Sequence, residues 1–287
     1  MSLPVEEVRL RLPHIELAAH VYGPEDGIPV IAVHGWMDNI MSFARLIPRL
    51  HGLRIVAVDL AGHGHSDHRP SGSFYPVWEN VHDLLLVAEQ FGWQRFSLLG
   101  HSMGAIVSTL LAASVPQRVE RLALIDAILP LTSEAEAAPE DLGAAFEASL
   151  ALQHKRKRVH DSFEKAIEAR MKGKVPVNRE ASELLAQRGV MPVPGGYIWR
   201  TDSRLMLPSP VRFTLPQALA VARRVACPVS LVLADQGMMK RRAGFVELLE
   251  SFPFEIHHLP GRHHLHLEEE EGAEAVADCF NRFFHPT

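Results

Sequence analysis

The chain has 287 residues, of which 47% are hydrophobic and 22% are charged, and its formal net charge is −5. This composition is typical of a globular protein with a substantial core, whereas a nucleic-acid-binding domain is more often basic. Cys227 and Cys279 are the only cysteines, which excludes a scaffold built on disulfides.

The N-terminal stretch MSLPVEEVRLRLP carries acidic residues early and lacks a continuous apolar region. No uninterrupted apolar run elsewhere is long enough to span a membrane. We therefore expect a cytoplasmic protein with no stable membrane insertion. We also expect a small-molecule substrate as its partner and no nucleic acid, while the sequence leaves the oligomeric state open.

Short apolar runs alternate with amphipathic patterns through the first 126 residues. The apolar runs predict strands at residues 15–22, 30–33, 54–60, 96–99 and 119–125. Helical periodicity between the later runs predicts helices at residues 42–50, 78–91 and 103–114. Runs such as IVAVDL and LALID suit strands covered on both faces, so this region predicts a parallel sheet flanked by helices.

A long segment without strand patterns interrupts this alternation. Residues 131–210 are rich in Ala, Glu and Lys with helical spacing, and they predict an inserted, mainly helical cap. Alternation then resumes, with predicted strands at 229–234 and 254–259 and predicted helices at 242–249 and 271–284. We therefore expect one core domain made of residues 1–130 and 211–287, into which the cap at 131–210 is inserted.

The segment Gly100-His101-Ser102-Met103-Gly104 lies where a predicted strand gives way to a predicted helix. Glycines two residues on either side of the serine leave room for a sharp turn, which lifts the serine above the sheet edge in a strained conformation. The helix that follows directs its N-terminal N–H groups toward negative charge that develops beside Ser102. In this context the pattern predicts that Ser102 is a nucleophile.

This pattern resembles the α/β-hydrolase superfamily, and the resemblance covers nearly the whole chain. It includes VHGWMDN after the third strand, VAVDLAGHGHSDHRP after the fourth, GHSMG at the turn and LPGRHHLHLEEE after the last strand. The later segment GGYIWRTDSRLMLPSPVRFT is similar to the serine hydrolase-like proteins of that superfamily. The resemblance implies an α/β-hydrolase fold: a mostly parallel sheet of about eight strands flanked by helices, with a helical cap inserted after strand six.

A serine hydroxyl is a weak nucleophile, so a histidine must accept its proton. In the resembled family this base lies on the loop after the last strand, which implies His263, with His266 capping or packing near the final helix. His264 is a close competitor. The family also supplies two backbone N–H groups to an oxyanion, and these correspond to Trp36, after the third strand, and Met103, after the nucleophile.

Two carboxylates compete to orient this histidine. Most of the resembled superfamily places the acid after the seventh strand, where this chain reads Ala234-Asp235-Gln236-Gly237, with glycine at the expected position. Asp235 comes two residues early, so its carboxylate should point in a different direction. Asp126 ends the sixth strand, as in hydrolases such as the haloalkane dehalogenases. We favour Asp126 and retain Asp235 as the alternative.

Other polar clusters have structural interpretations. The segment HKRKRVH at 154–160 predicts a solvated face, and EEEE at 268–271 predicts an acidic first turn of the last helix. Trp199 and Asp202 are expected to form a packed aromatic and a local turn or salt bridge. A Gly-rich loop of the kind that the family uses structurally contains His63, His65, Asp67 and His68. Without thiol ligands or an HExxH pattern, we predict no metal site and no cofactor.

The sequence therefore predicts a carboxylesterase-like serine hydrolase that cleaves a small or medium ester through an acyl-enzyme intermediate. The predicted catalytic residues are Ser102, His263 and Asp126. The same arrangement also serves thioester, lactone and C–C bond hydrolases, because the fold and the triad leave substrate choice to the pocket. A non-catalytic binding protein on a hydrolase scaffold is the alternative from another class, although every residue type that catalysis requires is present.

Overall fold

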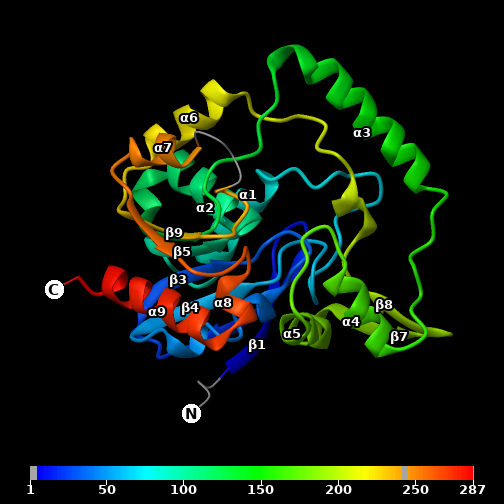
Figure 1. The fold of residues 1–287 in the computed structure, drawn as a ribbon, viewed down its shortest axis with the longest axis horizontal. Helices are drawn as coiled ribbons and strands as arrows, with labels where there is room; N and C mark the ends of the chain where they lie inside the picture. Colours follow the sequence, from blue (N-terminus) through cyan, green and yellow to red (C-terminus); the bar gives the residue numbers. More distant parts are fainter. Residues whose placement is uncertain (1–4, 241–244, 287) are drawn as a thin grey trace.

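The structure, a computed structural model, describes residues 5–240 and 245–286, and an eight-stranded sheet forms its centre (Figure 1). The strand order is β1-β2-β4-β3-β5-β6-β9-β10. Within this sheet, as far as the structure describes it, only the pairs β1–β2 and β2–β4 are antiparallel. The predicted α/β-hydrolase fold class is thus confirmed. The strands are β1 (Val5–Arg11), β2 (Glu16–Tyr22), β3 (Ile28–Val33), β4 (Leu53–Val58), β5 (Phe96–His101), β6 (Val119–Ile125), β9 (Val229–Ala234) and β10 (Glu255–Leu259).

Helices cover both faces of the sheet because side chains alternate along each strand. In β3, Ile31 and Val33 contribute to the core on one face, whereas Val30 and Ala32 contribute to the core on the other. The first core is closed by α1 (Glu79–Gln90), α2 (Met103–Ser114), α6 (Leu215–Arg224) and α7 (Phe245–Glu250). The second is closed by α8 (Leu265–Glu268), α9 (Glu270–Phe284), η1 (Ile40–Phe43) and η2 (Ile47–Arg49). None of the helices in the described ranges combines the length and apolar character that a membrane crossing requires.

Some segments differ from the sequence-based expectation. The helix predicted at 42–50 is wrong: the chain forms the two short 3₁₀ turns η1 and η2 instead, because Pro48 lacks the N–H that a continuous helix needs. The pattern does not predict β1, since Leu10 is the only buried residue of this edge strand, and it does not predict α6. The helix predicted at 242–249 begins outside the described residues, and α7 is its described part.

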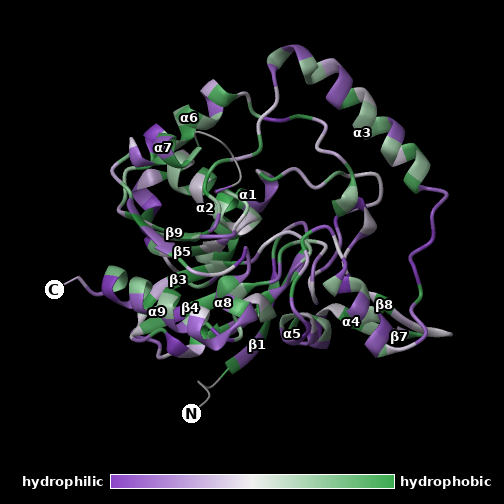
Figure 2. Cartoon of the chain, viewed as in Figure 1, coloured by the Kyte–Doolittle hydropathy of each residue, from purple (hydrophilic) through white to green (hydrophobic). Residues whose placement is uncertain are grey.

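The chain leaves the core after β6 and returns before α6, and a bridge between Thr132 and Phe213 joins the two connections. The segment between them is mainly helical but also contains an unpredicted hairpin, β7–β8. A small apolar core holds α4, α5 and the hairpin together, whereas α3 lies apart at the outer edge with mixed polarity along its length (Figures 1 and 2). The elements are η4 (Ala135–Ala137), α3 (Ala138–Leu152), α4 (Phe163–Met171), α5 (Arg179–Gly189), β7 (Val190–Val193), β8 (Gly196–Trp199) and η5 (Ser203–Met206).

The close approach of α2 to β3 depends on Gly104. A Cβ atom on Gly104 would lie 1.9 Å from the carbonyl oxygen of Val33, which is backbone of a central strand. We expect Gly104→Ala to lower the free energy of unfolding by about 1–3 kcal/mol, the usual cost of overpacking, as measured by urea titration. Gly143→Ala is the control, because a Cβ atom at this helical position meets no atom within 4 Å. An unchanged stability of Gly104→Ala would contradict this account of the turn.

Candidate active site

Ser102 lies in the turn that joins β5 to α2. Its backbone has φ 53° and ψ −119°, a left-handed conformation that is strained for a residue with a side chain. The residues before and after it are fixed, since β5 ends at His101 and α2 begins at Met103. The turn therefore holds the Ser102 hydroxyl at the carboxyl edge of the sheet, as the sequence pattern predicts.

Three side chains from different loops meet at this edge. The Nε2 atom of His263, on the loop after β10, lies 2.8 Å from Ser102 Oγ. The Nδ1 atom of the same ring lies 2.6 Å from Oδ2 of Asp126, the residue directly after β6. Asp126 is fully buried, so the carboxylate faces its histidine in the absence of competing bulk water. These contacts form a continuous serine–histidine–carboxylate relay.

The alternatives that the sequence left open lie elsewhere. His264 Nε2 lies 2.9 Å from Asp38 Oδ2, and His266 Nε2 lies 3.1 Å from Ser42 Oγ, so both of these imidazoles are engaged away from the hydroxyl of Ser102. Asp235 forms an ion pair with Lys240 and keeps 45% of its side chain exposed. The structure brings Asp126, and not Asp235, against the histidine that contacts the serine.

The position of Asp126 also explains the unexpected glycine after β9. The Asp126 carboxylate accepts hydrogen bonds from the backbone N–H groups of Ala234, at 3.1 Å, and Met238, at 2.9 Å. A Cβ atom on Gly237 would lie 2.3–2.6 Å from the three atoms of that carboxylate group. The space that a side chain at position 237 would enter is therefore filled by the carboxylate from β6.

The two residues predicted to supply oxyanion donors lie next to the turn that contains Ser102, in the chain or in space. Met103 is the first residue of α2, where a backbone N–H has no partner one turn earlier in the helix. Trp36 belongs to the loop after β3, and a Cβ atom on its neighbour Gly35 would lie 3.1 Å from Ser102 Cβ. The indole Nε1 of Trp36 donates to the carbonyl of Leu205 in the cap, at 2.8 Å, which fixes the loop.

The sequence analysis missed a buried carboxylate that links these loops. Asp38 Oδ2 lies 2.9 Å from His264 Nε2 and 3.6 Å from His101 Nδ1, while Oδ1 accepts from the Arg170 guanidinium at 2.8 Å. His101 Nε2 in turn donates to the carbonyl of His263 at 3.0 Å. The motif HGWMDN contains this aspartate, but no spacing pattern in the sequence pairs it with His264 or Arg170, which are both more than a hundred residues away.

Burial keeps the imidazoles of this cluster neutral. It lowers the pKa of His264 to about 3 even though Asp38 is adjacent, and it lowers the pKa of His101 and of His266 below the ordinary value. Burial acts to raise the pKa of the Asp38 carboxyl, but its contacts with His264, His101 and Arg170 hold that pKa well below the ordinary value. Asp38 is therefore an anion that is held by the neutral His264 imidazole and the Arg170 guanidinium.

The remaining candidate residues are separated. His63 contacts the backbone of Ala61, His65 pairs with Glu7, and the third histidine of that loop, His68, pairs with Asp202. In the described part of the chain these histidines are not gathered around a common point.

Trp199 and Asp202 pack as expected. The indole of Trp199 donates to the Ala166 carbonyl, and Asp202 caps η5 and pairs with Arg204. The acidic run at 268–271 is split, because Glu268 ends α8 and is buried, whereas α9 begins at Glu270.

A cavity of about 170 Å³ lies between the loop after β3 and the inserted segment 131–210. Trp36 and Met37 line it from the core, while Trp199 and Met206 are among the residues that line it from the cap. The cavity beside Trp36 is thus largely apolar.

The fold defines a class of protein, and the comparisons agree with it. Residues 28–169 match the model of the alpha/beta hydrolase fold family. A serine hydrolase-like protein of Danio rerio is 31% identical over 98% of this chain and 89% of its own length. The chain belongs to the α/β-hydrolase family.

Within this family the chain is similar to the serine hydrolase-like proteins, and membership supports its assignment as a hydrolase. The crystal structure of a hypothetical protein from Pseudomonas aeruginosa PAO1 is 64% identical, with a TM-score of 0.95 over 97% of this chain and 99% of that one. A thioesterase domain from the curacin biosynthetic pathway shares the fold at 24% identity, with a TM-score of 0.82 over 96% and 98% of the two chains.

The buried histidines make stability depend on pH. Burial lowers the pKa of His63 and of His264 to about 3, while both titrate at about 6.5 in the unfolded chain. Below pH ~6.5 the unfolded state therefore binds more protons than the folded state, and stability falls as the pH drops from there toward 3.

We expect the melting temperature to decrease on acidification through this range, and to decrease less steeply in His264→Gln. His154→Gln, at an exposed position, is the control and should keep the wild-type slope. Differential scanning fluorimetry across the pH range measures both slopes, and identical slopes for the two variants would show that His264 is not a source of the acid sensitivity.

Proposed function

We propose that the protein is a serine hydrolase with carboxylesterase-like activity, which cleaves a small or medium ester through an acyl-enzyme intermediate. The single observation that carries this proposal is the relay from Ser102 Oγ through His263 to Asp126, with contacts of 2.8 and 2.6 Å. Such contacts are the geometric signature of an activated serine nucleophile. A non-catalytic scaffold has no need to maintain them at a strained turn.

In the proposed reaction His263 Nε2 accepts the Ser102 proton while Oγ bonds to the substrate carbonyl carbon. The backbone N–H groups of Trp36 and Met103 stabilise the resulting oxyanion, and Asp126 stabilises the imidazolium. His263 then gives the proton to the leaving alcohol as the carbon–oxygen bond breaks. In the second half, His263 takes a proton from water, the hydroxide attacks the acyl group, and the proton returns to Ser102 as the acid departs.

We place a non-reacting part of the substrate in the cavity beside Trp36. Its volume of about 170 Å³ is below the usual range for sites that enclose a drug-sized ligand, which favours a small group. Its lining by Met206 and Trp199 of the cap supports an apolar group. The 131–210 segment then controls the substrate range, and the core supplies the catalytic residues.

Replacement of the serine tests the proposal. Ser102→Ala should lose turnover of p-nitrophenyl esters by about 10⁴-fold or more and should no longer be labelled by a fluorophosphonate. Ser108→Ala is the control, because this buried serine of α2 bonds to its own helix at Gly104. A Ser102→Ala protein that is labelled normally would place the nucleophile elsewhere. Assays of lactones and acyl thioesters alongside the esters identify the preferred bond.

We expect that the carboxylate that orients His263 can be moved from position 126, after β6, to position 237, after β9. Asp126 has φ 49°, so Asp126→Gly keeps a favourable backbone while it removes the carboxylate, and we expect kcat to fall by about 10⁴-fold. Adding Gly237→Asp refills the vacated space from the β9 side, and the double variant should recover kcat at least tenfold relative to Asp126→Gly alone.

The control for this experiment is Asp126→Gly combined with Gln236→Asp, which adds a carboxylate at the neighbouring exposed position. We expect no recovery in this control. Equal activity of the two double variants would show that the gain reflects added charge and not the position of the carboxylate. Near-normal activity of Asp126→Gly would remove Asp126 from the mechanism.

A further inference from the structure

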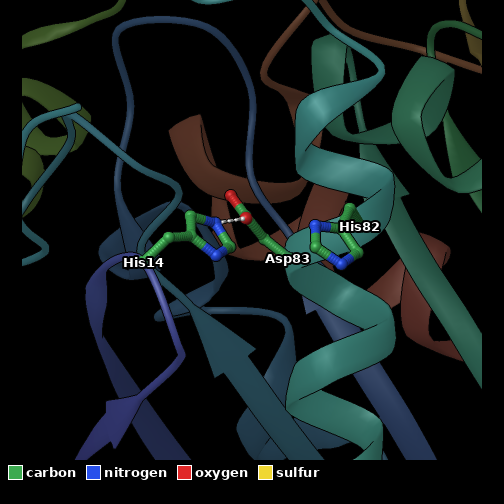
Figure 3. Close-up of side chains that lie close together, drawn as sticks. All are labelled: His14, His82 and Asp83. Carbon is green, nitrogen blue, oxygen red and sulfur yellow. Dashed lines mark hydrogen bonds and ion pairs between the residues drawn. The ribbon is translucent and has the colours of Figure 1, made fainter. Parts of the chain in front are cut away.

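Two histidines and an aspartate meet at a second place, on the turn between β1 and β2 and on α1 (Figure 3). One donor atom from each of His14, His82 and Asp83 lies within 4.8 Å of the other two. In Figure 3 the two imidazoles lie on either side of the Asp83 side chain. Their ring centroids are 5.5 Å apart, and the ring planes differ by only 8°. We propose that these three side chains form a binding site for a divalent transition-metal ion, with Zn²⁺ as the representative ion.

The donor set and its spacing suit this ion. Zn²⁺ binds imidazole nitrogen and carboxylate oxygen at about 2.0–2.2 Å, and three protein ligands plus water complete a tetrahedron. Such bond lengths place neighbouring donor atoms roughly 3.4 Å apart. His14 Nε2 and Asp83 Oδ1 are 2.8 Å apart. Both histidines are exposed, so solvent leaves room for their side chains to turn toward a common ion and for water to take the fourth position.

The carboxylate is already oriented for this role. Asp83 is buried, with 1% of its side chain exposed, and its Oδ2 atom accepts from the Arg69 guanidinium at 2.7 Å. The Oδ1 atom is the one that faces His14. A ligand carboxylate whose second oxygen is held by a neighbouring donor is the usual outer-shell arrangement of protein metal sites.

The local charge also favours a cation. Arg69 is paired with Glu79 at 2.9 Å as well as with Asp83, so two carboxylates surround one guanidinium and the group carries a net charge of −1. Imidazole ligands bind metal in their neutral form and leave this charge unchanged.

The described residues contain one other group with similar donors, formed by Asp38, His101 and His264. There all three side chains are buried, and the single carboxylate is balanced by Arg170. That group therefore offers an ion neither a solvent-exposed ligand nor a net negative charge. Of the two groups, the one formed by His14, His82 and Asp83 is therefore accessible from solvent, and its net negative charge attracts a cation.

Isothermal titration of tag-free protein with ZnCl₂ near neutral pH tests the site. We expect one Zn²⁺ per chain, with the same affinity in Ser102→Ala, because the site is separate from the candidate active site. His14→Gln and His82→Gln should each weaken binding by at least about tenfold, the lower end of what the loss of even an outer-shell partner costs. His154→Gln is the matched control and should bind as the wild type does.

Thermal melting supplies an independent readout that does not depend on the heat of binding. An ion that binds only the folded state raises the melting temperature, and this rise should be lost in His14→Gln and His82→Gln. These substitutions leave the buried Asp83–Arg69 pair intact, so both variants should fold. The proposal is overturned if the wild type binds no Zn²⁺, or if the two variants bind it as tightly as the control does.

Discussion

Asp38 is a charged group in the interior, and the arrangement of the candidate site depends on how that charge is compensated. A buried carboxylate is stable only when its neighbours donate hydrogen bonds or carry opposite charge. Its partners come from three other segments: His264 from the loop after β10, His101 from the end of β5 and Arg170 from the cap. These contacts link the loop after β3, the turn that contains Ser102, the loop after β10 and helix α4 to one buried carboxylate.

A second constraint is that the residue after β6 and a residue in the turn after β9 compete for the same space beside His263. In this chain the carboxylate that contacts His263 comes from Asp126 after β6, and the residue after β9 that would collide with it is Gly237. The backbone of that turn contributes instead, since the N–H groups of Ala234 and Met238 hydrogen-bond the carboxylate. Both strands end at the same edge, so either can deliver an acid to the imidazole. Only one side chain fits the space.

The cap is attached to the core through polar side chains at buried positions. Arg188 of α5 pairs with the fully buried Asp59 after β4, and Asn39 donates its side-chain amide to the Leu185 carbonyl. The cap also has its own small apolar core, which stabilises α4, α5 and the hairpin together. These hydrogen bonds and ion pairs, together with the separate core, position the inserted segment beside the loop after β3, and the cavity next to Trp36 lies between the two. The position of the cap is thereby coupled to the loop that supplies a proposed oxyanion donor.

The sequence by itself determined the fold class and the turn that contains Ser102, whereas the loop of His263 was implied by the resemblance to the α/β-hydrolases. The first two features follow from local patterns: apolar runs of strand length, helical periodicity, and glycines at fixed offsets from a serine. It did not determine Asp38 as a hub, the hairpin in the cap, the 3₁₀ turns around Pro48 or the grouping of His14 with Asp83. The hairpin and the 3₁₀ turns are local features that the hydrophobic pattern alone did not reveal. The contacts of Asp38 and of His14 join residues far apart in the chain, so only the tertiary structure brought those side chains together. The choice between Asp126 and Asp235 belongs to the same category, because it was decided by which carboxylate occupies one small space beside His263.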